Sequence, residues 1–397
     1  MATFSTRFLG CKISFADAQA IRERLLGDGH VEVPEGGEVQ VVNTCCVTHE
    51  AVSKSRQAAA RSARSARTVY VTGCASRLDG AFDAAPANVV VTGHVGEEAA
   101  SFVAGDVGAI GCVNAERGLE RVRAFVKIQD GCSFSCAFCV IPLVRGATRS
   151  RTAEAVLAEI RRRVAQGHGE IVLTGVNLGC FRDRVAGYTL ARLVREAGSL
   201  SRVERLRLSS IEVNHVDDEL ATAIHETPTV SRHLHVPLQS GDDAVLRAMG
   251  RRYSVAQYER RLERLAGVQL TTDVIVGFPG EDEAAFERTV QLVERLGMAK
   301  VHVFPYSPRP GTRTATEDTV PLEVKRERSA RLRALSDTLA RRRWAGRVGT
   351  LDRVLIDRPG RGYADDYTPW LLEGAVGDFV TALAVGVGEE GVLAVAA

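Results

Sequence analysis

Residues 130–139 read DGCSFSCAFC, and they follow directly on a strand candidate, VRAFVKIQ, at 122–129. Three cysteines fall within eight positions of this loop: Cys132, Cys136 and Cys139. Thiolates hold iron–sulfur clusters, and a cubane 4Fe–4S cluster has four corners. Three close thiolates would leave one iron open to a cofactor, which a fully ligated electron carrier does not permit.

A structural zinc site is the main alternative for this loop. Such a site needs four Cys or His ligands, usually in spaced pairs. The loop holds no histidine, and the nearest other cysteines, Cys112 and Cys180, lie twenty or more residues away. Buried apolar cysteines are a weaker alternative, because the loop alternates its cysteines with Ser133 and Ser135. Cluster chemistry is therefore favoured.

The loop opens a series of short β-rich runs separated by amphipathic helical patterns. This alternation predicts βα repeats and a parallel sheet. Six repeats would form most of a barrel, a partial (β/α)6 barrel rather than a closed eight-stranded one. The cysteine loop would then lie on the side where barrel active sites form. The six strand candidates are 122–129, 170–175, 205–210, 233–238, 271–277 and 301–307.

The first hundred residues show the same alternation and predict a separate parallel α/β sheet. Strand candidates at 3–8, 39–45, 68–74 and 88–93 alternate with helical stretches at 15–26 and 49–66. The carboxyl ends of parallel strands share one edge of a sheet, where ligands bind. Three cysteines directly after strands should meet there: Cys11, Cys45 and Cys74. Each of these cysteines follows its strand in a similar context, Gly10-Cys11, Thr44-Cys45 and Gly73-Cys74, which favours Cys45 over the adjacent Cys46.

The C-terminal part combines a basic helix with a small all-β segment. Nine Lys and Arg stand between Lys325 and Arg347 against only Glu327 and Asp337. Four short strand patterns with Gly-rich turns follow, which predicts a small barrel of the size that binds nucleic acids. The GxGxxG at 386–391 is a turn, because no helix follows to receive a phosphate.

Composition limits the possible classes of protein. The 397 residues are 45% hydrophobic and 25% charged, which suits a globular chain of two or three domains. A net charge of +2 means that any nucleic-acid site depends on local basic patches. Nine cysteines, no export signal and no apolar run near 20 residues argue against a disulfide framework and for a cytoplasmic location.

These motifs resemble known families. The CxxxCxFC loop after a strand, with Phe138 beside the last cysteine, resembles the radical S-adenosylmethionine (SAM) superfamily. The wider set LGCK, VVNTCCVT, VTGC, VNLG, RLSSIE, HLHVPLQSG, TTDVIVGFPGE and FPYSPRPGT is similar to the methylthiotransferases, in family order across nearly the whole chain. The closest resemblance is to the tRNA threonylcarbamoyladenosine methylthiotransferase branch. The last fifty residues, with Gly362-Tyr363 and Asp366-Tyr367, resemble the RNA-binding TRAM domain.

The resemblance implies two 4Fe–4S clusters and three domains. Cys132, Cys136 and Cys139 match the ligands of the SAM-cleaving cluster, and Cys11, Cys45 and Cys74 match those of an auxiliary cluster. The usual NTCTVT is NTCCVT here, so Cys46 is an alternative to Cys45. Cys112 and Cys180 match no motif and are expected to be small buried residues. The expected domains are a methylthiotransferase domain (1–110), a radical SAM domain (118–345) and a TRAM-like barrel (346–397).

Residues that contact the cofactor or RNA in these families are assigned here only at positions where the motifs match. Candidates near SAM are Phe138, Gly175, Asn177, Ser209, Glu212 and Gln239. Candidates for RNA are the basic helix end and one barrel aromatic: Arg341, Arg342, Arg343, Trp344 and Tyr363. Arg145 and Arg151, just beyond the cysteine loop, are expected either to pair with a carboxylate or phosphate or to lie on a solvated surface.

The implied reaction places a methylthio group on C2 of N6-threonylcarbamoyladenosine at position 37 of tRNA. The resemblance implies that cleaved SAM gives a 5′-deoxyadenosyl radical, that the auxiliary cluster carries the sulfur and that a second SAM gives the methyl group. A flavodoxin- or ferredoxin-type electron donor is expected, while the sulfur donor and oligomeric state stay open. Alternatives are isopentenyladenosine in tRNA or a ribosomal protein side chain as the target. An iron–sulfur electron carrier or a non-catalytic RNA-binding protein is the alternative from another class.

Overall fold

The computed structural model describes residues 1–109 and 122–397, so Cys112 lies outside the described residues. The chain forms two compact units, which are described separately. The first, called unit 1 below, is mostly N-terminal. It comprises Met1–Gly118, Gly131–Phe134 and Val140–Ala147. The second, called unit 2, comprises Leu119–Asp130, Ser135–Cys139 and Thr148–Ala397.

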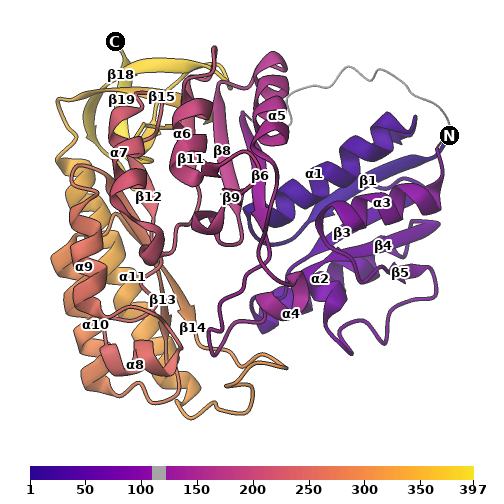
Figure 1. The fold of residues 1–397 in the computed structure, drawn as a ribbon, viewed down its shortest axis with the longest axis horizontal. Helices are drawn as coiled ribbons and strands as arrows, with labels where there is room; N and C mark the ends of the chain where they lie inside the picture. Colours follow the sequence, from indigo (N-terminus) through magenta and orange to yellow (C-terminus); the bar gives the residue numbers. More distant parts are fainter. Residues whose placement is uncertain (110–121) are drawn as a thin grey trace. The chain divides into compact units, whose positions relative to one another are not determined.

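Unit 1 contains a five-stranded parallel sheet in the order β2-β1-β3-β4-β5 (Figure 1). Its strands are β1 (Thr3–Phe8), β2 (Val31–Glu32), β3 (Val39–Thr44), β4 (Thr68–Gly73) and β5 (Val89–Val91). The predicted parallel sheet is confirmed, and the short edge strand β2 is an addition. β1, β3 and β4 are neighbours, so the three chain segments that carry Cys11, Cys45 and Cys74 leave the sheet side by side.

Helices cover both faces of this sheet. α1 (Lys12–Gly27) and α3 (Gly96–Val107) pack their apolar residues on Phe4, Val41 and Tyr70. α2 (His49–Ser62) packs Ala58 and Ala59 on Val42, Val69 and Val71 of the other face. The short elements are η1 (Cys74–Arg77) and α4 (Ile141–Arg145).

Two helix bounds differ from the sequence prediction. α1 begins at Lys12 rather than at residue 15, and Cys11 is its N-cap residue. α2 ends at Ser62, four residues before the predicted end, and turns carry the chain from there into β4. Sequence patterns locate helix ends poorly because the last turn is decided by local backbone hydrogen bonds.

Six parallel strands of unit 2 form the predicted partial (β/α)6 barrel. They are β6 (Arg123–Asp130), β8 (Glu170–Gly175), β11 (Arg205–Leu208), β12 (His233–His235), β13 (Gln269–Val276) and β14 (Lys300–Pro305). β6, β8 and β11 pair in one sheet and β12, β13 and β14 in another. A parallel bridge between Ser210 and His235 joins β11 to β12. The six-strand prediction is confirmed in number and order.

The barrel helices that begin before residue 300 start at Ser, Thr or Asp caps, whose side chains accept hydrogen bonds from backbone N–H groups in the first turn. The last helix follows Pro321 and has no side-chain cap. The barrel helices are α5 (Ala153–Ala165), α6 (Leu190–Gly198), α7 (Asp218–Glu226), α8 (Asp243–Ala248), α9 (Val255–Glu263), α10 (Glu283–Leu296) and α11 (Leu322–Ala345). Short elements between them are β7 (Arg149–Ser150), η2 (Leu178–Cys180), β9 (Arg182–Asp183), β10 (Tyr188–Thr189) and η3 (Val213–His215). One continuous apolar core joins strands and helices.

The last fifty residues form a closed five-stranded barrel in the order β15-β16-β17-β19-β18. Its strands are β15 (Leu351–Arg358), β16 (Arg361–Tyr363), β17 (Pro369–Leu371), β18 (Phe379–Val387) and β19 (Val392–Ala396). Trp370 is fully buried at its centre. The GxGxxG segment is the turn between β18 and β19, where Gly388 N–H donates to Gly391 O at 2.8 Å. That prediction is confirmed.

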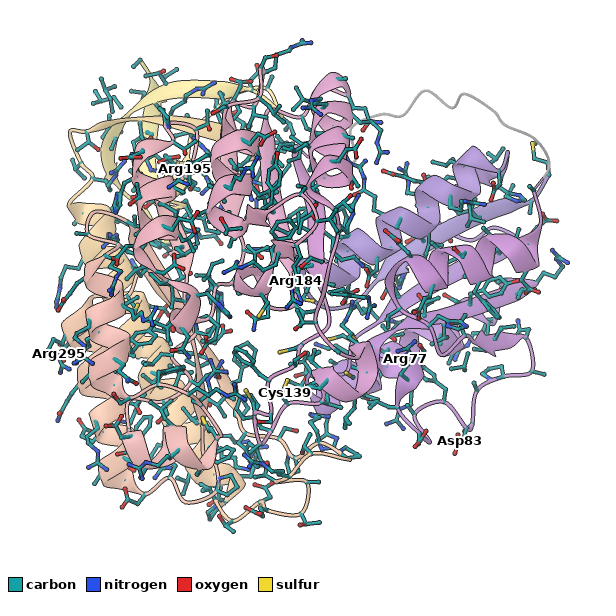
Figure 2. The ribbon with its side chains drawn as sticks, in the orientation of Figure 1. Arg77, Asp83, Cys139, Arg184, Arg195 and Arg295 are labelled. Atoms are coloured by element: carbon teal, nitrogen blue, oxygen red, sulfur yellow. The ribbon has the colours of Figure 1, made fainter. Side chains whose placement is uncertain are left out.

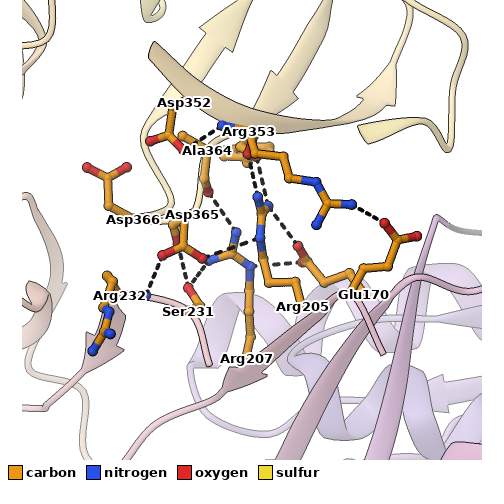
Figure 3. Close-up of polar contacts among 12 residues, drawn as sticks. Glu170, Arg205, Arg207, Ser231, Arg232, Asp352, Arg353, Ala364, Asp365 and Asp366 are labelled. Atoms are coloured by element: carbon orange, nitrogen blue, oxygen red, sulfur yellow. Dashed lines mark hydrogen bonds and ion pairs between the residues drawn. The ribbon is translucent and has the colours of Figure 1, made fainter. Parts of the chain in front are cut away.

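A buried ionic cluster joins this small barrel to the (β/α)6 barrel (Figure 3). Glu170, with no exposed surface, pairs with Arg123 at 2.7 Å, Arg207 at 2.9 Å and Arg205 at 3.1 Å. Arg205 also donates to the carbonyls of Tyr363 and Arg353, and Arg207 to those of Ala364 and Asp365. The two barrels of unit 2 are therefore held together through main-chain acceptors.

Among the described residues, no helix combines the length and the apolar character needed to cross a bilayer.

Candidate functional site

The three N-terminal cysteines meet at the carboxyl edge of the parallel sheet. Cys11 caps α1 after β1, Cys45 follows β3, and Cys74 opens η1 after β4. Cys11 is exposed, while Cys45 and Cys74 are buried. Burial is the main reason that the pKa of Cys45 rises to about 11, and the nearby Cys11 and Cys74 thiols raise it further. The cysteines thus follow neighbouring strands at one edge of the sheet, and Cys45 lies near both Cys11 and Cys74.

Glycines allow the cysteine turns to pack this closely. Gly10 has φ +121°, and a Cβ added there would lie 2.7 Å from the Cys45 Cβ and 3.1 Å from its Sγ. Gly73 has φ +84°, and a Cβ there would lie 2.6 Å from the Thr44 carbonyl oxygen. Only glycine fits both the left-handed backbone and the contact. The Gly–Cys pairs of the sequence are thus required by close packing.

Cys46 lies in a different environment from Cys45. It has no exposed surface and belongs to an apolar cluster with Val52, Val140 and Cys74. Its side chain hydrogen-bonds Cys74, and this bond is the largest cause of a Cys74 pKa lowered to about 7. The Cys45 sulfur instead lies against Gly10, next to Cys11. This arrangement supports Cys45 as the ligand and Cys46 as its buried neighbour.

Two buried polar side chains beside the cysteines lack partners among the described residues. Asn43 and Thr72 are register partners at the ends of β3 and β4, and both have no exposed surface. The Asn43 Oδ1 and Nδ2 and the Thr72 Oγ1 make no hydrogen bond there. An orphaned buried amide is costly unless a bound group satisfies it. An unpartnered amide at the sheet edge where the three cysteines leave β1, β3 and β4 fits a bound group such as an iron–sulfur cluster.

Arg145 contacts this site from α4. Its Nε donates to the Cys74 Sγ at 3.0 Å, and its Nη2 pairs with the Asp17 Oδ2 at 2.7 Å. Arg145 is 1% exposed and Asp17 is fully buried. Of the two expectations for Arg145, the carboxylate pair is the one observed, with a cysteine sulfur in addition. Arg151, in unit 2, pairs with Glu159 at 2.5 Å.

The CxxxCxxC loop leaves the carboxyl end of β6, on the predicted side of the barrel. Cys132 belongs to unit 1, where its N–H donates to Gly146 O at 3.0 Å. Cys136 and Cys139, the latter labelled in Figure 2, belong to unit 2. All three are half-buried. In unit 2 the loop is fixed at Ala137, whose N–H donates to Met249 O at 2.8 Å.

Polar groups at the strand ends of unit 2 point to a ligand site. The Asn177 Oδ1 and the Ser209 Oγ are buried and have no hydrogen-bond partner within the described ranges. They follow the neighbouring strands β8 and β11. Gln129, which the sequence analysis did not single out, accepts from Asn177 N–H at 2.8 Å and lies against Gly175. Two orphaned acceptors at one edge fit a polar ligand such as SAM.

Glu212 takes part in an ion pair that reaches the cysteine loop. Arg251 Nη2 pairs with Glu212 Oε1 at 3.3 Å, and Arg251 Nη1 donates to the Cys136 Sγ at 3.4 Å. Burial raises the pKa of Glu212, while Arg251 and hydrogen bonds from Asn214 oppose the shift. Sequence inspection missed Arg251, because one arginine in Gly-Arg-Arg-Tyr gives no signal of a sulfur contact.

The other candidates near SAM lie in the same unit. Phe138 is half-buried, with its ring centroid 6.2 Å from that of Phe278. Gln239 has φ +70°, a left-handed backbone that non-glycine residues rarely adopt. Its N–H donates to Asp273 O and its carbonyl accepts from Ile275 N–H, which fixes this strained backbone. Strain held in this way is typical of ligand sites.

The candidate RNA residues have mixed environments. Arg341 and Arg342 are exposed at the end of α11, while Arg343 hydrogen-bonds Gln269. Trp344 packs against the core of the small barrel. Tyr363 is half-buried, 4.9 Å from the Tyr367 ring centroid and 4.7 Å from the Arg123 guanidinium.

Cys180 differs from expectation. It is half-buried rather than buried, and its sulfur lies 3.4 Å from the His215 Nε2. It is the last residue of η2, between the buried Gly179 and Phe181.

Family models match both units. The "Radical SAM superfamily" model matches residues 126–293, and the "Uncharacterized protein family UPF0004" model matches residues 3–96. Among solved structures, the radical S-adenosylmethionine methyltransferase TsrM from Kitasatospora setae superposes with a TM-score of 0.57. It covers 79% of this chain and 77% of that one at 14% identity, so it supports the fold alone.

Curated relatives match over most of their length. The "Threonylcarbamoyladenosine tRNA methylthiotransferase MtaB" of Bacillus subtilis is 36% identical, over 86% of this chain and 82% of that protein. The protein of the same name from Thermotoga maritima is 33% identical, over 99% of this chain and 96% of that protein. The chain belongs to the radical SAM tRNA methylthiotransferase family. It is therefore a transferase that uses SAM and 4Fe–4S clusters, and the resemblance drawn from the motifs is confirmed.

Members named for another nucleoside are nearly as similar. The "tRNA-2-methylthio-N(6)-dimethylallyladenosine synthase" of Jannaschia sp. is 33% identical over 89% of this chain and 83% of that protein. The identities of the two groups overlap, at 33–36% for the first and 32–34% for the second, so overall identity does not separate them.

Proposed function

We propose that this methylthiotransferase modifies C2 of N6-threonylcarbamoyladenosine at position 37 of tRNA. The observation that carries the proposal is a group of three relatives named for threonylcarbamoyladenosine, which are 33–36% identical over 86–99% of this chain. The sequence motifs LGCK, VNLG and FPYSPRPGT point to the same branch.

The cluster ligands are proposed from the two cysteine groups. Cys11, Cys45 and Cys74 would hold the auxiliary cluster, which fits their convergence at one sheet edge above the orphaned Asn43 amide. Cys132, Cys136 and Cys139 would hold the SAM-cleaving cluster. When bound, the two clusters supply the radical cleavage of SAM and the sulfur atom to be transferred.

The protein's own part in the reaction is to bind, orient and shield. The orphaned Asn177 Oδ1 and Ser209 Oγ would accept hydrogen bonds from SAM, and Gln129 holds the Asn177 backbone in place. Arg251 sets the position of Glu212 beside the Cys136 sulfur. Phe138, Gly175 and Gln239 complete the proposed pocket. These mostly buried groups would keep water away from the reacting atoms.

Residues 346–397 and the end of α11 are proposed to bind tRNA. The rest of the chain is proposed to form a methylthiotransferase domain at 1–110 and a radical SAM domain at 118–345. The exposed Arg341 and Arg342 support phosphate contacts. Base stacking by Trp344 and Tyr363 would need them to leave the protein contacts described above. Replacing Arg341 and Arg342 with Glu should weaken tRNA binding and lower its salt dependence, with Arg162→Glu on α5 as the exposed control. Unchanged binding would refute the assignment.

Deletion of the small barrel is a poor test of RNA binding in this protein. It would remove the carbonyls that accept from Arg205 and Arg207 and would expose Glu170. Point variants leave this buried cluster intact.

The substrate is tested by nucleoside analysis of tRNA from cells with and without the gene. The methylthio derivative of threonylcarbamoyladenosine should disappear on deletion and return with the intact gene but not with Cys74→Ala. Loss of the isopentenyladenosine derivative alone would assign the chain to the second group of relatives. We further propose a cytoplasmic location, where tRNA is found, and an electron donor of the flavodoxin or ferredoxin type.

A further inference from the structure

Arg145 of unit 1 is almost fully buried and contacts a cysteine sulfur. A guanidinium cannot lose its charge in a protein, so its burial at 1% exposure requires compensation. The compensation comes from Asp17 at 2.7 Å and the Cys74 Sγ at 3.0 Å. Because burying this charge is costly, we infer that the charge serves the site or its packing.

The three groups come from distant parts of the sequence. Asp17 lies in the second turn of α1, which Cys11 caps, and Cys74 opens η1. Arg145 lies at the end of α4, six residues after Cys139. The apolar neighbours Cys46, Val140 and Val144 surround this contact, so water does not screen it.

We propose that Arg145 is a positioning residue that raises the reduction potential of the auxiliary cluster through its hydrogen bond to the Cys74 sulfur. The proposal rests on the assignment of Cys11, Cys45 and Cys74 as cluster ligands. One-electron reduction adds a negative charge to the ligand set, and a buried cation with an N–H directed at a ligand sulfur favours the reduced form. Asp17 opposes it, because its carboxylate is a buried negative charge in the same place.

The two partners therefore make predictions of opposite sign. Arg145→Gln removes the cation and should shift the potential to more negative values. Asp17→Asn removes the anion and should shift it to more positive values. Arg145→Lys keeps the charge without the planar N–H geometry and should give an intermediate value. A role in packing alone would not produce shifts of opposite sign.

The test uses the full chain with Cys132, Cys136 and Cys139 all replaced by alanine, so that only the auxiliary site is loaded. After anaerobic reconstitution, the midpoint potential is measured by a redox titration followed by electron paramagnetic resonance, with a low-potential one-electron reductant. Arg22→Gln is the matched control, because Arg22 pairs with Glu32 at 2.6 Å in the same unit and is likewise poorly exposed. Its potential should not change.

The outcomes separate this inference from the proposed function. If the chain that carries only the three loop-cysteine replacements binds no 4Fe–4S cluster, the ligand assignment is overturned and the inference with it. A loaded cluster whose potential is the same in Arg145→Gln, or moves in the same direction in Arg145→Gln and Asp17→Asn, would overturn the inference alone. If Arg145→Gln does not take up a cluster, the Asp17→Asn and Arg145→Lys variants decide by the sign of their shifts.

Discussion

The two cysteine groups are assembled by opposite routes. Cys132, Cys136 and Cys139 lie within eight residues of one loop, whereas Cys11, Cys45 and Cys74 come from three separate turns. The loop depends on local sequence, while the second group depends on the parallel order of β1, β3 and β4. A mutation that disturbs this sheet should therefore affect the N-terminal group more than the loop group, of which only Cys132 belongs to the same unit.

An arginine–carboxylate pair contacts one sulfur in each region. At the N-terminal site, Arg145 and Asp17 have side chains 1% and 0% exposed. At the loop, Arg251 and Glu212 are 7% and 9% exposed, and their contacts are longer, at 3.3 and 3.4 Å. The closed pair suits a fixed charge beside a permanent group. The looser pair suits a pocket that exchanges SAM and products.

The largest expected effects come from removing a ligand in either region. Cys136→Ala should abolish formation of 5′-deoxyadenosine from SAM, because the SAM-cleaving cluster is lost. Cys74→Ala should retain SAM cleavage and yield no methylthio product. Both are measured by chromatography of the reaction products after anaerobic reconstitution. Methylthio product from the Cys74→Ala variant would show that the two regions do not differ as described.

The cluster around Glu170 is a third buried arginine–carboxylate contact, and it includes no sulfur atom. Glu170→Gln should destabilise unit 2 by about 3–5 kcal/mol, because three buried arginines lose their shared counter-charge. Urea unfolding measures this, with Glu204→Gln as the control. Glu204 pairs with Arg353 at the surface, and its loss should cost about 1 kcal/mol or less. Iron content should be normal in both variants.

The same cluster predicts a pH dependence. Burial would raise the pKa of Glu170, but Arg207, Arg123 and Arg205 outweigh burial and hold it below 4.5. A depressed carboxyl pKa contributes stability above its unfolded value, and the contribution is lost as the pH falls through the folded value. Unfolding free energies of the wild type should therefore fall below about pH 4.5 more steeply than those of Glu170→Gln. Parallel curves would contradict the assignment.

Arg251→Gln should weaken SAM binding by about tenfold, since one charge-assisted contact is worth about 1.5–3 kcal/mol. Equilibrium binding of SAM to the reconstituted protein measures the change. Arg288→Gln is the control, because Arg288 pairs with Asp242 at 2.8 Å and its side chain is about half exposed. Equal affinities for Arg251→Gln and the wild type would show that the loop pair serves packing alone.

The smallest expected effect concerns Cys46. Cys46→Ala should keep the iron of the auxiliary site and cost about 1 kcal/mol for the lost buried atom. Cys45→Ala should lose that iron. Iron and sulfide analysis of proteins that lack the loop cysteines distinguishes the two. The reverse result would make Cys46 the ligand.

The sequence predicted these regions unequally. The fold class, the strand order and the two cysteine groups follow from periodicity, from Gly–Cys contexts and from family motifs, because strands and ligand spacing leave local patterns. Arg251, Gln129 and the unpartnered Asn43 amide were not predicted, since their roles depend on side chains that meet only after folding. The helix ends of α1 and α2 were misplaced because local backbone hydrogen bonds decide the terminal turns.

The junction between the two barrels of unit 2 combines backbone and side-chain contacts, because Arg205 also pairs with the Asp365 carboxylate at 3.4 Å. Arg205 and Arg207 donate to the main-chain oxygens of Tyr363, Ala364 and Asp365, which every amino acid provides. Substitutions in this turn would therefore leave the main-chain contacts intact as long as the chain keeps its course, but not the contacts of the Asp365 carboxylate. A chimera carrying the terminal module of a distant homologue should dock correctly if that turn has the same length and keeps an acidic residue at position 365.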